Sequence, residues 1–134
     1  MMKVILTLLA AAVTVLFLPS AHFAYAMTFT VTGTNVDATY TEPSTNANGT
    51  PLTDLAKTTI YYDLGAGPVV AKIVPATALT GGGNVATTIT VPVLEGQEAD
   101  VRFFVTASDT SGNESARSGE VIKRIDRLAP GPPN

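Results

Sequence analysis

The chain lacks cysteine and tryptophan and has a single histidine among its 134 residues. Without cysteine there is no disulfide, no thiolate nucleophile and no cysteine-ligated metal site. The one histidine, His22, lies in an apolar N-terminal stretch. If that stretch is removed, no imidazole is left for a Ser–His–Asp or Cys–His arrangement or for a zinc site. We therefore expect a protein that is not an enzyme and that uses no cofactor.

Charge is also scarce. Charged residues make up 14% of the chain, with 8 basic against 11 acidic side chains and a formal charge of −3. Nucleic-acid binding favours a basic patch, so this balance argues against a nucleic-acid partner. Hydrophobic residues make up 46% of the chain, but much of that hydrophobicity lies in the first 26 positions.

Residues 1–26 are typical of a signal peptide. Lys3 supplies a positive start, residues 4–18 form an uncharged apolar run, and Ala24-Tyr25-Ala26 offers the small-x-small pattern of a cleavage site between Ala26 and Met27. The run is shorter than the roughly 20 residues of a bilayer span, so we expect secretion, extracellular or periplasmic, with no membrane span after cleavage. The alternatives are an uncleaved N-terminal anchor, or Met27 as a second start that gives a cytosolic product.

After residue 27 the sequence favours strands. Several short runs alternate polar and apolar residues, and no stretch shows a helical apolar stripe. With the Gly- and Asn-rich turn signals between them, these runs predict strands near 28–33, 36–41, 57–63, 69–74, 85–93, 100–108 and 118–124. Seven short strands in about 100 residues indicate an all-β, antiparallel sandwich. The Pro-rich residues 126–134 are expected to be an extended linker or tail.

Two regions resemble bacterial fibronectin type III domains. Residues 40–43, 48–56 and 60–62 resemble the B–C region of that family, and residues 105–115, closing with Ser118 and Val121, resemble its F–G hairpin. The resemblance covers most of residues 28–125 and implies a fibronectin type III-like domain over residues 27–125. The implied fold is a seven-stranded, immunoglobulin-like Greek-key sandwich in which strands C, F and G share a sheet.

The chain departs from the family pattern at three core positions. Tyr40 stands where the family usually has tryptophan, Thr58 stands where it has an aromatic residue, and no corner tyrosine occurs near Val101. Other side chains must then fill the core. We expect the core to contain Tyr40, Ile60, Tyr62, Phe103 and Val105, with Phe29, Ile89 and Leu94.

Three short segments have the residue types of ligand sites. Residues 109–114 are rich in oxygen ligands but lack the spacing of a calcium-binding EF-hand loop, so a plain hairpin turn competes with calcium binding. Residues 81–83 are three glycines without the pattern of a phosphate-binding loop, and we expect a flexible connection there. Glu95, Glu98 and Asp100 are acidic, but we expect them on a solvated turn rather than in a catalytic pair.

One face of the sandwich carries interface residue types. If Ile60, Phe103 and Val121 point inward, period-two alternation turns their neighbours outward on strands C, F and G. That outward set is Tyr61, Arg102, Phe104, Ile122 and Arg124. Exposed aromatic and aliphatic side chains rimmed by arginine favour a partner-binding face. The alternative is ordinary cross-strand packing with no partner.

These observations predict a secreted, non-catalytic fibronectin type III module for protein–protein or cell-surface interaction. The partner would be an unknown protein or a surface polysaccharide, and we expect a monomer. Two alternatives remain. The chain could be a structural spacer related to a tandem-domain surface protein, or a carbohydrate-associated accessory module.

Overall fold

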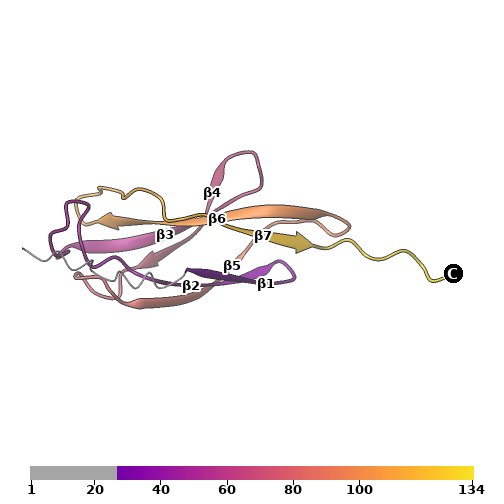
Figure 1. Cartoon of the computed structure of the whole chain (residues 1–134), viewed down its shortest axis with the longest axis horizontal. Helices are drawn as coiled ribbons and strands as arrows, with labels where there is room; N and C mark the ends of the chain where they lie inside the picture. The colour runs from indigo at the N-terminus through magenta and orange to yellow at the C-terminus, as the bar shows by residue number, and fades with distance from the viewer. Residues whose placement is uncertain (1–26) are drawn as a thin grey trace, which may run out of the picture.

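The computed structural model describes residues 27–134 (Figure 1). The expected signal peptide, residues 1–26 including Ala26, lies outside the described residues. The described part contains seven strands: β1 (Thr28–Thr32), β2 (Asn35–Thr41), β3 (Leu55–Asp63), β4 (Pro68–Pro75), β5 (Asn84–Thr90), β6 (Glu98–Asp109) and β7 (Val121–Asp126). Between Met27 and Asn134 no helix has the length and hydrophobicity needed to cross a membrane.

The strands form two antiparallel sheets that lie face to face. One sheet has the order β1-β2-β5 and the other the order β4-β3-β6-β7. Figure 1 shows the two layers edge-on, with β3, β6 and β7 above β1, β2 and β5. The prediction of an all-β antiparallel sandwich is therefore confirmed. Arg127 is still hydrogen-bonded to Gly96 and Gln97, and residues 128–134 form no regular element and run away from the sandwich (Figure 1).

Strand boundaries differ most from the predicted ones at the end of β5, which stops at Thr90 instead of residue 93, and in the segment between β6 and β7. The last strand begins at Val121 instead of residue 118, whereas β6 extends to Asp109. Residues 115 and 118 still follow β6, because Ser115 N donates to Ala107 O and Ser118 N donates to Val105 O. The serine hydroxyls of Ser115 and Ser118 accept hydrogen bonds from Ala107 N and Val105 N. At residue 118, where the last strand was predicted to begin, a side-chain oxygen thus takes the place of a backbone acceptor.

The core lies between the sheets and is centred on two phenylalanines. Phe29 of β1 and Phe103 of β6 stack with ring centroids 4.6 Å apart. Around this pair lie the buried aliphatic side chains Val36, Ile60, Val85, Ile89, Val91, Val93, Val101, Val105 and Ile125. The expected core residues Tyr40, Ile60, Phe103 and Val105 are buried, and Tyr62 packs half-buried against the cluster.

The expectation that Leu94 fills the core is wrong. Its side chain is 65% exposed. Val91 and Val93 both point inward, so period-two alternation turns Leu94 outward at the start of the turn that leads to β6. This turn is closed by a hydrogen bond from Gln97 N to Leu94 O. The space is filled instead by Val91, Val93 and Val101.

A buried carboxylate fixes the connection between β4 and β5. Glu42, only 3% exposed, accepts hydrogen bonds from the backbone N (2.8 Å) and the hydroxyl of Thr77. Glu42 N in turn donates to Gly83 O, and Gly82 N donates to Pro43 O. The three glycines are thus bound closely to the end of β2. The connection expected at residues 81–83 therefore has backbone hydrogen-bond partners in residues 42–43.

Strand β4 is an edge strand with several irregular features. Pro68 and Pro75 stand at its two ends, and the register with β3 shifts between Ile60 and Tyr61. Lys72 reaches across to the other sheet, where its Nζ donates to Thr87 Oγ1 at 2.6 Å and to Thr88 O at 3.3 Å. The tip of the β3–β4 hairpin stands clear of the sandwich (Figure 1).

Replacing Phe103 with alanine is expected to lower the free energy of unfolding by about 3–5 kcal/mol, because the ring is fully buried and its removal leaves a cavity. Urea denaturation measures the loss. The control is Ile122→Ala, a 58% exposed residue of β7, which should change stability by no more than about 0.5 kcal/mol. An F103A protein with an unchanged unfolding midpoint would contradict the inward orientation of Phe103.

Gly81→Ala is expected to destabilise the protein more than Gly96→Ala. Both glycines have positive φ, 61° and 78°, so both substitutions cost about 1–2 kcal/mol of backbone strain. Only at residue 81 would the new Cβ also meet backbone, 1.9 Å from Pro43 O, whereas Gly96 has open space around it. We expect G81A to cost on the order of 3 kcal/mol. Equal melting temperatures for the two variants would show that the backbone at Pro43 moves away from the new Cβ at no cost in stability.

Candidate functional site

The outward surface of the four-stranded sheet is the candidate site, and we call it the outer face. Strand register places its side chains in rows that run across β4, β3 and β6. One row is Val70, Tyr61 and Phe104. A second row is Ile73, Thr59 and Thr106. Farther along the sheet, Arg102 is paired with Ile122 and Asp100 with Arg124. The register therefore brings all five predicted residues, Tyr61, Arg102, Phe104, Ile122 and Arg124, to one face.

Phe104, however, is not exposed. Its ring points outward but is only 2% accessible. It stacks on Tyr61, with ring centroids 4.9 Å apart, and the guanidinium carbon of Arg117 lies 4.3 Å from the ring centre. The expectation of an exposed Phe104 fails because the segment after β6 folds back over the strand and places Arg117 on the ring. A cation over an aromatic face is attracted by its quadrupole, which favours this placement.

Glu114 fixes the start of the same segment. Its Oε1 accepts hydrogen bonds from the Tyr61 hydroxyl at 2.9 Å and from the Thr106 hydroxyl at 2.6 Å. These bonds favour the ionised carboxylate, so the pKa of Glu114 lies below its ordinary value, with Thr106 the larger cause and Tyr61 the second. The same carboxylate raises the pKa of the Tyr61 phenol, because it accepts the phenol proton in a hydrogen bond.

The two predicted arginines differ in their surroundings. Arg124 forms ion pairs with Glu98 and, at 3.4 Å, with Asp100. Arg102 is exposed and, among the described residues, has no ion-pair partner. The charge of Arg124 is therefore paired with two acids of the neighbouring strand β6. The charge of Arg102 is not paired in this way and stays available at the outer face.

Strand β4 adds two residues that the sequence interpretation missed. Val70 and Ile73 are 50% and 53% exposed and lie in the same rows as Tyr61 and Thr59. The segment from Val69 to Val74 is almost continuously apolar, so alternation gives no sign of which side chains face outward. Glu114 and Arg117 were also missed, because they lie in an irregular segment with no periodicity.

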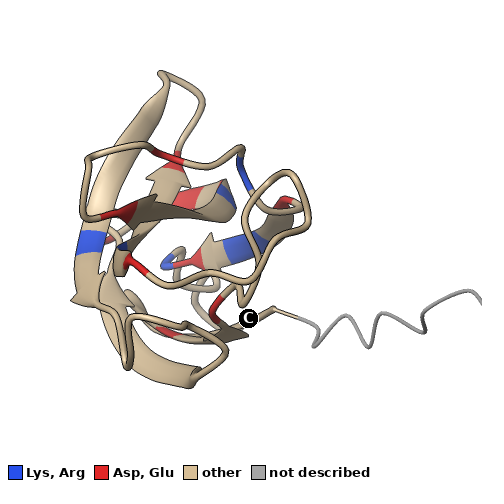
Figure 2. Ribbon diagram, turned by 90° about the vertical axis from the view of Figure 1, so that its left-hand side faces the viewer, with Lys and Arg blue, Asp and Glu red and all other residues tan. Residues whose placement is uncertain are grey.

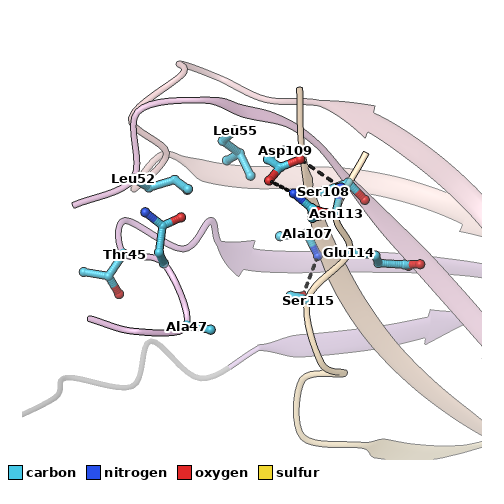
Figure 3. A pocket seen from close by; sticks show the side chains of 11 residues that line it. Thr45, Ala47, Leu52, Leu55, Ala107, Ser108, Asp109, Asn113, Glu114 and Ser115 are labelled. Atoms are coloured by element: carbon cyan, nitrogen blue, oxygen red, sulfur yellow. Dashed lines mark hydrogen bonds between the residues drawn. The ribbon is translucent and has the colours of Figure 1, made fainter. Parts of the chain in front are cut away.

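A small pocket lies at the end of the sandwich where the loops gather (Figure 3). Its volume is about 210 Å³, and it lies between the loop at residues 45–52 and the turn at residues 109–115. Leu52, Leu55 and Ala107 line it, with Asn46 and Asp109 among its polar groups. Drug-sized ligands occupy roughly 300–1,000 Å³, so this pocket suits at most a single side chain or a ring.

The turn at Asp109 uses its own carboxylate internally. Asp109 Oδ1 accepts hydrogen bonds from Ser111 N and Asn113 N, and Oδ2 accepts one from Asn113 Nδ2. Asn113 is the first cause of the lowered pKa of Asp109. Glu114 points away from Asp109 (Figure 3). The turn alternative for residues 109–114 therefore has a full hydrogen-bonding account, and in residues 27–134 no three acidic or histidine side chains form a metal-ligating group.

A second cavity of about 300 Å³ adjoins Tyr40 and Thr58. Tyr40, Thr58 and Val105 line it, together with residues 115–118. The Tyr40 hydroxyl and Thr58 Oγ1 form a buried hydrogen bond of 2.6 Å. Burial is the main reason why the pKa of Tyr40 is raised. Tyr40, expected in the core, is thus buried between the sheets with Thr58 as its hydrogen-bond partner.

Acidic and basic residues are interspersed over the strands and loops that Figure 2 shows, instead of being separated by sign. Comparison with family models, curated proteins and solved structures finds no match for this chain. The site residues are therefore assigned by geometry. What the outer face offers chemically is apolar contact area, stacked aromatic rings and guanidinium groups.

Thr106→Val is expected to raise the pKa of Glu114 toward its ordinary value, and Tyr61→Phe to raise it by less, because Thr106 is the larger cause of the lowering. Carboxyl-carbon NMR titration measures both. Since the folded-state pKa lies below that of the unfolded chain, these hydrogen bonds stabilise folding above the ordinary pKa of glutamate. Their contribution is lost as the pH falls through the lowered value. A Glu114 midpoint that neither substitution moves would contradict this hydrogen-bonding scheme.

Proposed function

We propose that the chain is a secreted, non-catalytic, fibronectin type III-like module that binds a macromolecule through the outer face. The strand order supports the resemblance, since β3, β6 and β7 occupy the positions expected of strands C, F and G and share one sheet. The order β1-β2-β5 in the other sheet agrees with a Greek-key arrangement of the immunoglobulin-like type. The signal-peptide pattern of residues 1–26 supports secretion.

The observation that carries this proposal is the exposure of three aliphatic side chains on one face. Val70, Ile73 and Ile122 are each at least half exposed and share the face with the stacked Tyr61 and Phe104. Sandwich strands ordinarily present polar side chains to water on their outward side. Large apolar side chains gathered there, beside tyrosine and arginine, are the residue types of interaction sites.

A non-catalytic role is supported by the chemistry of the face. Its acidic side chains already have partners: Glu114 binds two hydroxyls, and Asp100 pairs with Arg124. A general acid or base needs a titratable group positioned to reach a substrate proton. On this face the polar groups hold the strands and the F–G segment in place, and the apolar groups remain for contact.

The test compares the wild-type protein with a Val70→Ser/Ile73→Ser double variant. Each protein is immobilised and exposed to cell-envelope extract and to insoluble polysaccharide from the source organism. We expect the double variant to bind a partner that wild type retains at least about tenfold more weakly, because both substitutions remove exposed apolar contact area from the outer face.

The matched control is Leu79→Ser/Leu94→Ser, since these leucines are 59% and 65% exposed but lie in loops away from the outer face. This control should bind as wild type does. An equal loss of binding in both double variants would indicate nonspecific adsorption to exposed apolar side chains. Retention by the V70S/I73S protein would reject the outer face, and no retention by any protein would favour the spacer alternative.

A further inference from the structure

We propose that the outer face recognises a polypeptide surface on which carboxylates stand next to apolar side chains. This inference rests on the proposed function and names the partner chemistry of that same face. It comes from a difference between the acidic and the basic side chains of the face in whether they have partners within the protein. The acidic groups are engaged inside the protein, whereas two of the guanidinium groups are not paired with acids.

The acids of the face have internal partners. Asp63 stands opposite Arg102 in the ladder, but its Oδ1 accepts hydrogen bonds from Gly65 N at 2.6 Å and Gly67 N at 3.1 Å, which holds it in the hairpin turn. Glu114 accepts the hydroxyls of Tyr61 and Thr106. Glu98 and Asp100 both pair with Arg124, and Asp126, which stands opposite Glu98 in the ladder, accepts a hydrogen bond from Leu128 N.

Arg102 and Arg117 are the two guanidinium groups left over. Both are exposed, and within residues 27–134 neither forms an ion pair. Arg117 is held over the ring of Phe104, so its position is fixed by stacking and its N–H donors remain free for a ligand. A guanidinium that is already positioned loses less side-chain entropy when it binds, and it matches a carboxylate with two parallel hydrogen bonds.

Apolar side chains surround these donors. Ile122 lies directly beside Arg102 in the ladder between β6 and β7, and Val70 lies in the same row as the Tyr61–Phe104 stack that Arg117 covers. A partner that covers both guanidinium groups must therefore also cover aliphatic surface. Carboxylates interleaved with apolar side chains, as along an exposed strand or acidic peptide, complement this arrangement.

The alternative anionic partners fit less well. A polyanion such as nucleic acid or an acidic polysaccharide is attracted by a continuous basic stripe. Here the two free guanidinium groups are separated by apolar residues on a chain whose formal charge is −3. Long-range attraction to a polyanion is therefore weak, and recognition depends on local contacts that an acidic polypeptide provides.

The experiment is an NMR titration of the isotope-labelled protein with three short synthetic peptides. One alternates Glu and Val, the second Ser and Val, and the third Lys and Val; polygalacturonate serves as an anionic polysaccharide. We expect the Glu–Val peptide to shift resonances of β3, β4, β6, β7 and the Arg102 and Arg117 side chains. We expect its affinity to exceed that of the Ser–Val peptide by about tenfold or more and to fall with added salt.

Two substitutions identify the donors. Arg102→Gln/Arg117→Gln should reduce Glu–Val affinity to that of the Ser–Val peptide. Lys123→Gln is the matched control: it removes one positive charge from β7, at a position next to Ile122 whose side chain points to the other side of the sheet, and it should leave affinity unchanged. Arg117→Lys keeps the charge without the planar fork and should give an intermediate affinity. Unchanged melting temperatures exclude unfolding as the cause.

Three results would overturn the inference. Equal binding of the Glu–Val and Ser–Val peptides would show that carboxylates are not recognised. Tighter binding of polygalacturonate that depends on Arg102 and Arg117 would assign the face to a polysaccharide. If no peptide binds while the V70S/I73S protein still loses a captured partner, the inference is wrong and the proposed binding module stands.

Discussion

The stacking of Phe29 on Phe103 is the contact on which the rest of the sandwich depends. The chain has no cysteine, so no covalent bond joins the two sheets, and their attachment comes from side chains that meet between them. This pair joins β1, at the edge of one sheet, to β6, in the interior of the other. Because the rings are fully enclosed, the strands on either side must keep a parity that places Ile60, Val101 and Val105 around them. The direction of every outward side chain on the larger sheet follows from that parity.

Strand β6 therefore carries two aromatic stacks back to back. Phe103 meets Phe29 in the core, and the next residue, Phe104, meets Tyr61 on the opposite side of the sheet. The second stack holds the segment between β6 and β7 in place, as the first holds the two sheets together. Arg117 lies on the Phe104 ring, and Glu114 binds the Tyr61 hydroxyl. The outer face is consequently a composite, in which strands supply the rings and aliphatic groups and an irregular segment supplies the cation. Its geometry changes if either stack is lost.

The sequence allowed the sandwich and most inward residues to be predicted, because alternation is a local signal. Tyr40, Ile60, Phe103 and Val105 were placed correctly, and the register does bring Tyr61, Arg102, Phe104, Ile122 and Arg124 to one face. Alternation shows to which side of a sheet a side chain points, but not whether other residues cover it. It therefore could not show that Arg117 covers Phe104. The expectation for Leu94 was wrong because it departed from the alternation of Val91 and Val93, which turns Leu94 outward. Val70 and Ile73 lie in a strand that is apolar except for Lys72, so alternation does not show which way they point. Glu42 binds Thr77, which follows β3 and β4 in the chain, and such a distant contact has no periodic signal.

The irregular features of β4 affect whether another chain can pair with its edge. An edge strand rich in valine and isoleucine is an open template on which another chain can add by main-chain hydrogen bonding. Here a proline stands at each end, the register shifts in the middle, and Lys72 is bound to the neighbouring sheet. These are devices that discourage uncontrolled edge-to-edge growth into aggregates. Within its eight residues β4 therefore combines apolar side chains on the outer face with a backbone edge whose ends and middle are poorly suited to pairing with another strand.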